Sequence, residues 1–253
     1  MYRTQLLSSK CALVTGAARG NGAALARGLS DHGAKVILVD VDADGLEAQL
    51  GCLKAEGRDC AAMVLDVGDR DACRAAAAQF AATHGDLDIL VNNAGVRPRH
   101  AFDAPDRDAH WDRAIRVNLE GIRNTTLAWL DGLRRRQGTV INITSIAGFN
   151  ASPGSIGYST SKAGAQMLSK ALACELAAEG IRVNAIAPGV IETDMTIPSR
   201  SEPVRRERLL SRIPMARFGR PEDLVGAAVF LASNLSSYVT GCTIAVDGGY
   251  LAN

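Results

Sequence analysis

Residues 10–22 of the chain read KCALVTGAARGNG, a short apolar run that leads straight into three glycines. Lys10–Thr15 is predicted to be a strand, because its centre is continuously apolar, as in strands buried on both faces. A helical pattern over Asn21–His32 follows at once. Glycines between a strand and a helix allow a tight bend and let backbone N–H groups approach a pyrophosphate closely. The spacing G-x-x-x-G-x-G therefore predicts a phosphate-binding loop, with a plain glycine turn as the alternative.

The strand–helix alternation that begins here continues to the end of the chain. Further strands are expected at Lys35–Val39, Cys60–Leu65, Leu87–Val91, Thr139–Thr144, Arg182–Ala187 and Thr243–Val246. Helices are expected at about Asp44–Glu56, Arg70–His84, Asp108–Arg136, Tyr158–Glu179 and Pro221–Ala232, with an irregular stretch that ends at about Pro214. Such alternation implies right-handed crossovers and a mainly parallel sheet. We therefore predict an α/β fold, a doubly wound parallel sheet of about seven strands with helices on both faces.

Length and composition exclude several classes of protein. The chain has 253 residues, which suits a single α/β domain spanning 1–253. Its 28 Lys and Arg against 27 Asp and Glu leave a net charge of +1, which argues against nucleic acid or a membrane surface as the main partner. No apolar run reaches the ~18 residues of a membrane span. The six cysteines form no C-x-x-C pair and no His cluster joins them, so we expect no metal site and a reduced, cytoplasmic protein whose cysteines fill the core.

An acidic residue at the end of the second predicted strand bears on the choice of cofactor. Asp40 lies 18 residues beyond Gly22 (40 − 22), where a carboxylate can accept hydrogen bonds from ribose hydroxyls and repel a 2′-phosphate. Arg19 within the glycine loop could favour a 2′-phosphate, but Val41 rather than a basic residue follows Asp40. The sequence therefore favours NAD over NADP. Asp66 could hold the adenine edge or simply be the N-cap of the helix behind it.

A second group of residues suggests proton transfer. Tyr158 and Lys162 stand i and i+4 at the start of a predicted helix, so they share one face. A phenol ordinarily has a pKa of about 10, and a nearby ammonium stabilises the phenolate, which makes it a better base near neutrality. Ser145 ends the strand Thr139–Thr144, where a hydroxyl can hold a substrate oxygen and stabilise developing charge. Taken alone, a Y-x-x-x-K pair is most often a surface pair on a helix.

Asparagines at two positions extend this group. Asn118 lies in the helical stretch Val117–Leu119, where a buried amide is costly unless it is hydrogen-bonded. It could kink the helix and hold a water that relays protons through Lys162, or it could be a structural residue with a satisfied amide. The segment Asn92–Gly95 follows the strand Leu87–Val91 and could pack beside a cofactor, with a simple turn as the alternative.

Together these residues resemble the short-chain dehydrogenase/reductase family over essentially the whole chain. The resemblance rests on T-G-x-x-x-G-x-G at Thr15–Gly22, N-N-A-G at Asn92–Gly95, Asn118, Ser145, Y-x-x-x-K at Tyr158–Lys162 and P-G-x-x-x-T at Pro188–Thr193. It implies a Rossmann-type domain that binds a nicotinamide dinucleotide, a substrate lid over about residues 190–214, and commonly a homotetramer. Asn21 departs from the family pattern, which usually has an aliphatic residue at that position.

The resemblance also implies roles for individual residues. Tyr158 would be the acid/base, Ser145 would orient the carbonyl or hydroxyl, Lys162 would bind the nicotinamide ribose and tune Tyr158, and Asn118 would anchor a water relay. These four would form the catalytic tetrad. The cofactor would be bound by Gly16, Arg19, Gly20, Asn21, Gly22, Asp40, Asp66, Val67, Asn93, Ala94, Gly95, Tyr158, Lys162, Pro188, Gly189, Ile191 and Thr193.

The sequence says less about the substrate. Candidate pocket residues are Arg97, Asn150 and Met195, together with Arg99, His100, Phe149, Ala151 and Ile197. The basic residues after Gly95 suggest a polar or anionic substrate, although Arg97, Arg99 and His100 are more often a solvated rim. The arginines of the lid are likewise expected to form a solvated helix face, and they are Arg200, Arg205, Arg206 and Arg208.

The expectation that results is an NAD-linked oxidoreductase that oxidises a secondary alcohol in a small polyol, sugar or hydroxy acid. The alternatives are a 3-oxoacyl-(carrier protein or CoA) reductase or a hydroxysteroid-type dehydrogenase that uses NADP(H). The 3-oxoacyl-carrier-protein reductases mostly use NADPH and present basic residues beside the active-site helix. Here Asp40 disfavours NADPH, and Glu179 places an acid at the end of that helix. A non-catalytic dinucleotide-binding protein would be expected to lack Tyr158 or Lys162, and both are present.

Overall fold

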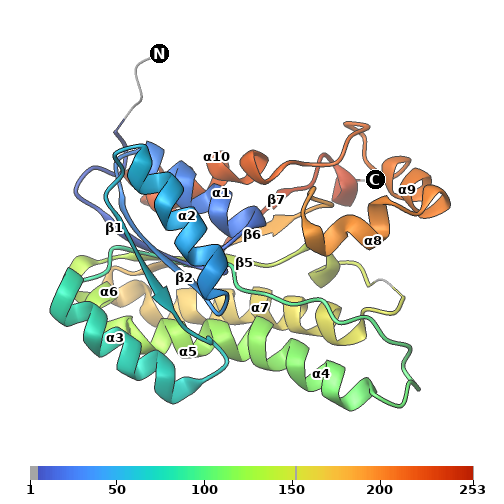
Figure 1. The fold of residues 1–253 in the computed structure, drawn as a ribbon, viewed down its shortest axis with the longest axis horizontal. Coiled ribbons are helices and arrows are strands. Elements are labelled where there is room, and N and C mark those ends of the chain that lie inside the picture. Colours follow the sequence, from blue (N-terminus) through green and yellow to red (C-terminus); the bar gives the residue numbers. More distant parts are fainter. Residues whose placement is uncertain (1–4, 152, 253) are drawn as a thin grey trace.

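A single parallel sheet forms the centre of the computed structural model, which describes residues 5–151 and 153–252 (Figure 1). Within those residues the sheet has seven strands in the order β3-β2-β1-β4-β5-β6-β7, and every neighbouring pair is parallel. The strands are β1 (Cys11–Thr15), β2 (Lys35–Asp40), β3 (Cys60–Val64), β4 (Ile89–Asn92), β5 (Thr139–Ile143), β6 (Arg182–Pro188) and β7 (Thr243–Val246). The predicted doubly wound α/β fold is therefore confirmed. The predicted domain range of 1–253 also includes residues 1–4, 152 and 253, which lie outside the described residues.

Helices cover both faces of the sheet (Figure 1). One layer holds α1 (Gly20–Asp31), α2 (Ala43–Ala55) and α10 (Val225–Ala232). The opposite layer holds α3 (Arg70–His84), α4 (Arg107–Ile115), α5 (Gly121–Ala128), α6 (Leu130–Arg136) and α7 (Ile156–Leu176). Two short helices, α8 (Ile197–Arg200) and α9 (Pro203–Leu210), lie in the segment expected to be a lid.

Each face of the sheet has its own apolar core. Along β1 the side chains alternate, so Val14 belongs to the core under α1 and Leu13 belongs to the core on the opposite face. Leu25 and Leu29 of α1 are fully buried in the first core, and Phe80 of α3 is buried in the second. Burial on both sides explains why these strands are continuously apolar in sequence.

The strand order reverses at β1, which pairs with β2 on one side and with β4 on the other. The chain first winds outward to β3 and then returns to build β4 on the other edge of β1. At such a reversal the loops that follow the two central strands separate and leave a crevice at their carboxyl ends. The glycine loop after β1 and the segment after β4 meet there, which positions the site.

The long helix predicted over Asp108–Arg136 is divided in the structure. A π-helical turn at Arg116–Glu120 separates α4 from α5, and Trp129 separates α5 from α6. Helical periodicity does not reveal a single inserted residue, because the apolar stripe resumes after it.

The stretch predicted to be irregular before Pro214 contains the short helices α8 and α9, so that prediction was wrong for this part. Glu202 caps α9 by accepting hydrogen bonds from the backbone N–H groups of Val204 and Arg205, at 3.0 and 2.7 Å. Pro203 supplies the preset backbone angle of a first helical residue. The helix buries none of its described residues fully, and only Leu209 and Leu210 at its end pack against a small apolar cluster, which is too short a pattern to predict a helix.

The six cysteines differ in burial, and Cys60 is partly buried. Cys11 and Cys73 are buried, and burial raises the pKa of each thiol to about 11, so they act as small apolar residues. Cys52, Cys174 and Cys242 are exposed, so the prediction that the cysteines fill the core was wrong for these three. Cysteine is apolar enough to be expected in a core, and the residue type alone does not predict that these three lie on helix surfaces and in a loop.

Candidate active site

A cleft of about 800 Å³ opens at the carboxyl ends of the central strands. Its wall includes most of the residues predicted for cofactor, catalysis and substrate. The predicted residues that are not on this wall are Gly22, Asn118, Arg99, His100, Phe149, Ala151 and Ile197. The predicted residues that line the cleft are Gly16, Arg19, Gly20, Asn21, Asp40, Asp66, Val67, Asn93, Ala94, Gly95, Arg97, Ser145, Asn150, Tyr158, Lys162, Pro188, Gly189, Ile191, Thr193 and Met195.

The glycine loop has the backbone geometry that only glycine adopts readily. Gly16 and Gly20 have φ values of +65° and +55°. A Cβ on Gly22 would lie 1.9 Å from the carbonyl oxygen of Gly16, so the loop and the first turn of α1 are in direct backbone contact. No described side chain caps the start of α1 at Arg19, which leaves its first N–H groups available to a phosphate.

The loop also fits the dinucleotide that the sequence predicts. The Oδ1 atom of Asn21 is buried at the cleft without a hydrogen-bond partner among the described residues. Such an orphaned polar atom is costly unless a bound group or water meets it. A glycine cradle closed to any Cβ, an uncapped helix start and this orphaned amide together suit a pyrophosphate with its attached riboses.

Thr15 and Asn93 lock the loop to the segment after β4. The Thr15 hydroxyl accepts hydrogen bonds from the backbone N–H groups of Asn93 and Ala94, both at 3.0 Å. The side-chain amide of Asn93 donates to the carbonyls of Thr15 and Gly16, at 2.9 and 3.1 Å. The sequence analysis did not single out Thr15, although its place at the strand end before the glycines was a usable signal. Asn92 serves the fold instead, since its amide donates to the Asn142 side chain at 2.9 Å.

Asp40 is held rigidly at the end of β2. Its carboxylate accepts hydrogen bonds from the backbone N–H groups of Ala18, at 3.0 Å, and of Asp42, at 3.1 Å. Arg19, the basic residue that complicates the cofactor assignment, forms a 3.1 Å ion pair with Asp42. The negative charge at the cleft wall is therefore fixed in place, and part of the positive charge of Arg19 is offset by a neighbouring acid.

Asp66 lines the cleft but does not cap a helix. Burial is the largest single influence and raises the pKa of its carboxyl, but the hydrogen bonds from Arg116 and the Gly68 backbone and the charge of Arg116 together lower that pKa below its ordinary value. Asp69 is the residue that caps α3, through the backbone N–H groups of Asp71 and Ala72. The N-cap alternative for Asp66 was therefore wrong, because α3 begins only at Arg70 and its N-cap position is Asp69.

Ser145, Tyr158 and Lys162 come together from β5 and α7. Ser145 follows β5 and begins a short 3-10 turn, where its hydroxyl accepts a hydrogen bond from the Ala147 N–H at 3.0 Å. Tyr158 lies in the first turn of α7, and the Nζ of Lys162 lies 5.9 Å from its ring centroid. Lys162 also donates to the carbonyl oxygen of Ile143 at 2.8 Å, which aims the ammonium into the cleft.

Two further residues that the sequence analysis missed support this group. Gln166, one turn beyond Lys162, donates to the backbone carbonyl of Ser145 at 3.1 Å and so ties α7 to the end of β5. Ser161 donates to the carbonyl of Tyr158 at 2.7 Å and accepts from the Asn118 amide at 2.9 Å. The sequence gives no signal for the role of either residue, since Ser and Gln are common on helices.

Asn118 sits in the π-helical turn, fully buried. Its Oδ1 accepts from the Val96 N–H at 2.8 Å, and its Nδ2 donates to the Val96 carbonyl at 2.9 Å. The side chain therefore clamps the segment after β4, and its amide is satisfied, as one of the two sequence interpretations expected. The irregular turn also agrees with the expected kink in this helix, while the water relay stays a prediction.

The burial of Lys162 predicts a dependence of stability on pH. Burial lowers the pKa of its ammonium from 10.5 to about 8. Between these values the unfolded chain binds more protons than the folded chain, so the free energy of unfolding rises with pH across this window. Below pH 8 both states are protonated and the contribution is constant. Urea titrations without cofactor measure the free energy of unfolding of the wild type and of Lys162→Met. The wild-type value should rise by ~1 kcal/mol or more relative to the variant between pH 8 and 10.5. A difference between the two proteins that does not change with pH would contradict this prediction.

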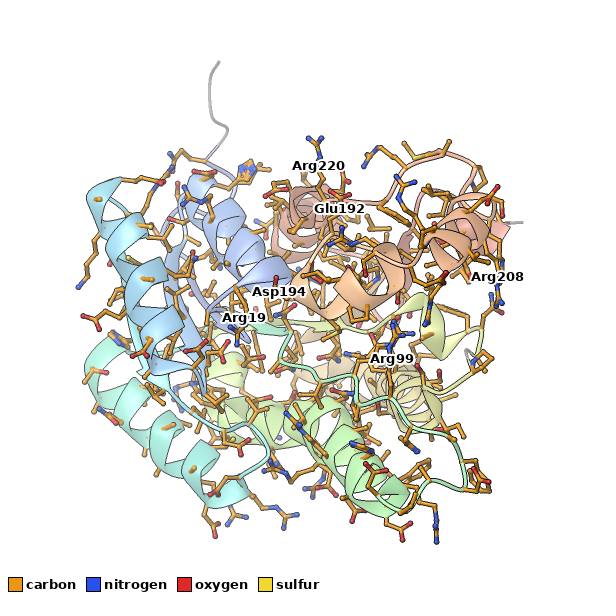
Figure 2. The ribbon with its side chains drawn as sticks, turned by 45° about the vertical axis from the view of Figure 1, so that its right-hand side comes forward. Arg19, Arg99, Glu192, Asp194, Arg208 and Arg220 are labelled. Atoms are coloured by element: carbon orange, nitrogen blue, oxygen red, sulfur yellow. The ribbon has the colours of Figure 1, made fainter. Side chains whose placement is uncertain are left out.

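The arginines near the substrate end are not simply solvated. Arg97 lies over the Tyr158 ring, with its Cζ 5.2 Å from the centroid, and Arg205 lines the cleft. Arg200 donates to the Thr196 hydroxyl at 3.0 Å. The expectations of a solvated rim for Arg97 and of a solvated helix face for Arg205 and Arg200 were wrong, because Arg97 packs over Tyr158 and the short helices α8 and α9 also line the cleft, through Ser199, Arg205 and Leu209. Arg208 is exposed, as expected (Figure 2).

Residues 5–151 and 153–252 contain neither a cluster of metal-ligating side chains nor a membrane-spanning helix. Among those residues no group of three or more His, Cys, Asp or Glu side chains could hold a metal ion. In the same part of the chain no helix combines the length and the apolar character that crossing a bilayer requires.

Comparison with known proteins gives matches over almost the full length. Residues 16–251 match a family model described as enoyl-(acyl carrier protein) reductase. The chain is 40% identical over 246 residues to a 3-oxoacyl-[acyl-carrier-protein] reductase of Thermotoga maritima, covering 96% of this chain and 98% of that protein. It is also 40% identical over 245 residues to nodulation protein G of Azospirillum brasilense, covering 96% and 98%.

Solved structures give a second set of similar proteins. A gluconate 5-dehydrogenase from Burkholderia cenocepacia, in complex with NADP and tartrate, has a TM-score of 0.95 and 36% identity, covering 99% of this chain and 98% of the other. A putative 2-deoxy-D-gluconate 3-dehydrogenase from Agrobacterium tumefaciens, with bound NADP, has a TM-score of 0.90 and 38% identity, covering 100% of both chains. With the motifs, the cleft and these full-length matches, the chain belongs to the short-chain dehydrogenase/reductase family of oxidoreductases, which use a nicotinamide dinucleotide.

Proposed function

We propose that the protein is an NAD(H)-dependent oxidoreductase that interconverts a secondary alcohol and a ketone in a small polyol, sugar or hydroxy acid. The observation that carries this proposal is that Tyr158, Lys162 and Ser145 line the same cleft as the glycine loop. A phenol beside an ammonium and a hydroxyl is a proton-transfer group next to a dinucleotide site. The similarity to solved gluconate dehydrogenases supports the substrate class.

In this proposal each residue has a defined task. When bound, the nicotinamide would supply or accept the hydride. Tyr158 takes the proton of the alcohol during oxidation, or donates it to the ketone oxygen during reduction. The Ser145 hydroxyl donates a hydrogen bond to the same oxygen and stabilises the charge that develops on it. Lys162 would hold the nicotinamide ribose and stabilise the phenolate, and Asn118 would anchor the path by which the proton reaches water.

The cofactor preference rests on Asp40. Its anchored carboxylate lies at the cleft wall, where it favours ribose hydroxyls and repels the charge of a 2′-phosphate. We therefore expect NAD to be preferred over NADP by at least tenfold in kcat/KM, although the solved relatives described above bind NADP. Asp40→Ser should reduce this ratio by ~10-fold or more, since a charge and two fixed acceptors are lost.

Steady-state kinetics with both nucleotides would test this preference. Glu47→Gln on the outer side of α2 is the matched control, because it removes one exposed acid without touching the cleft, and it should leave the ratio unchanged. An NADP preference of more than tenfold in the wild-type enzyme would refute the assignment of NAD.

A second candidate function is reduction of a 3-oxoacyl thioester. It is favoured by the 40% identity to 3-oxoacyl-[acyl-carrier-protein] reductases. Against it, Glu179 after α7 forms an ion pair with Arg134, so this end of the active-site helix offers a paired acid rather than a free basic surface. A panel of polyols, sugar acids and acetoacetyl thioesters, followed by NADH absorbance, distinguishes the two. Turnover confined to the thioesters would replace the first function with the second.

We also propose that the enzyme is a cytoplasmic homotetramer. Six free cysteines in the described residues suit a reducing compartment. Trp111 of α4 and Met167 of α7 are large apolar side chains that are partly exposed, at 38% and 63%, and their helices pack together. Burial of this pair of helices between subunits would cover them. A sedimentation mass near the 26.6 kDa of one chain would contradict the tetramer.

A further inference from the structure

Three arginines gather at the substrate end of the cleft. Arg97 and Arg99 lie on the segment after β4, and Arg205 lies on α9 of the lid. Arg97 and Arg205 line the cleft, and Arg99 donates a hydrogen bond to Ser199, which also lines it. Figure 2 shows Arg99 on the side of the cleft that faces the lid. Burial lowers the pKa of Arg99, and the charges of Arg97 and Arg205 lower it further, so the three guanidinium groups are electrostatic neighbours.

Within the described residues the guanidinium groups of this cluster have no acidic partner, and Glu202, three residues before Arg205, accepts hydrogen bonds from backbone N–H groups of α9 instead. In residues 5–151 and 153–252, no carboxylate forms an ion pair with any of the three arginines. Glu192 and Asp194 line the same cleft. They flank Thr193, whose methyl group faces Gly20 at the dinucleotide end. In the part of the chain that the structure describes, the three guanidinium charges at the substrate end are therefore not paired with a carboxylate.

Arg97 also has a donor that is not used. Its Nε is buried and lacks a hydrogen-bond partner among the described residues, while its Nη2 donates to the Ser155 hydroxyl at 3.3 Å. Burial lowers the pKa of Arg97, and the charge of Arg205 adds to this effect. A half-buried guanidinium with an idle N–H is costly unless an acceptor meets it. Anionic oxygens are the acceptors that a guanidinium fork matches best.

The position of Arg97 relates this charge to the reacting group. Its Cζ lies 5.2 Å from the Tyr158 ring centroid. A short substrate could therefore place its anionic group on Arg97 and, a few carbon atoms along the same molecule, its alcohol at the Tyr158 hydroxyl. We propose that Arg97, Arg99 and Arg205 bind an anionic oxygen group of the substrate, a carboxylate or a phosphate, so that the enzyme acts on hydroxy and oxo acids or sugar phosphates rather than on neutral polyols. This inference rests on the proposed function and narrows its substrate class.

Calorimetric titration of the NAD-loaded protein tests the subsite directly. Tartrate, glycerol 3-phosphate and threitol are the probes, since they present carboxylates, a phosphate and no charge on similar short chains. At least one anion should bind ten times more tightly than threitol. Stronger binding of tartrate identifies a carboxylate site, and stronger binding of glycerol 3-phosphate identifies a phosphate site. Equal binding of all three probes would overturn the proposal.

Variants separate a specific site from general charge. Arg97→Gln and Arg205→Gln should each weaken binding of the preferred anion by about tenfold or more and leave threitol unchanged. Arg208→Gln is the matched control, because Arg208 lies on the same helix α9, is exposed and points away from the cleft (Figure 2). If Arg208→Gln weakens anion binding as much as Arg205→Gln, the cluster is not a site. Arg205 is only partly buried on the short helix α9, so its variant stays informative even if Arg97→Gln does not fold.

Turnover distinguishes failure of this inference from failure of the proposed function. Oxidation of neutral polyols and of hydroxy acids with equal kcat/KM, unchanged in Arg205→Gln, would overturn the anion subsite and leave the oxidoreductase intact. Specific anion binding without any alcohol or ketone turnover would overturn the proposed function and leave the subsite intact.

Discussion

Tyr158→Phe is expected to lower kcat by at least ~10²-fold while the Kd for NAD stays within about twofold of the wild-type value. The substitution removes one oxygen and retains the ring that packs beneath Arg97 and beside Lys162. Loss of that oxygen leaves no group at this position that can exchange a proton with the substrate. Stopped-flow or steady-state NADH absorbance measures kcat, and fluorescence titration measures the affinity for NAD.

Tyr238→Phe is the control for this substitution. Tyr238 is fully exposed and lies outside the cleft, so removal of its hydroxyl should change neither kcat nor NAD binding. Retention of more than a tenth of wild-type kcat by Tyr158→Phe would remove Tyr158 from its role as acid/base. A parallel loss of NAD affinity would instead indicate that the hydroxyl holds the site together.

Gly22→Ala should abolish tight dinucleotide binding and lower the Tm. The added Cβ would lie 1.9 Å from the Gly16 carbonyl oxygen and 2.6 Å from the Asn93 amide nitrogen. The first of these atoms is backbone, so no side-chain rotation relieves the clash, and the loop must move away from α1. We expect the Kd for NAD to rise by ~100-fold or more and the unfolding free energy to fall by ~1–3 kcal/mol, a loss of roughly 2–12 °C in Tm.

Gly51→Ala provides the matched control. Gly51 lies inside α2, and a Cβ there meets no described atom within 4 Å. Alanine stabilises a helix interior by up to ~1 kcal/mol relative to glycine, so this variant should bind NAD normally and melt at the same or a higher temperature. Equal NAD affinity in Gly22→Ala and Gly51→Ala would show that close contact between the loop and α1 is not required.

The sequence determined the architecture because the information for it is local. Alternating apolar strands and amphipathic helices predict a parallel sheet by themselves, and the boundaries of α3 and β7 agree with the predicted ones residue for residue. The glycine spacing after the first strand and the spacing of Tyr158 and Lys162 are also local patterns. Both groups could therefore be assigned to a single crevice from the sequence. What a helix or strand places on one face can be read from a few neighbouring residues.

Other features depend on contacts between segments distant in sequence. The Thr15 hydroxyl becomes a brace only when the segment after β4 lies beside it, 78 residues away. Asn118 clamps Val96 across 22 residues, and a π-helical turn that periodicity does not reveal allows it to do so.

The arginine cluster shows the limit of sequence most clearly. Arg97 and Arg205 both look like solvated charges in the chain, and Arg205 is carried by a short helix with no fully buried residue. The glycine loop and the Tyr–Lys pair depend on spacing within one short segment, so the sequence itself determined them. Side-chain burial and charge balance depend instead on which elements pack together. The environment of these arginines, and with it the charge of the substrate that we propose, was decided only by the tertiary structure, in which α9 also lines the cleft.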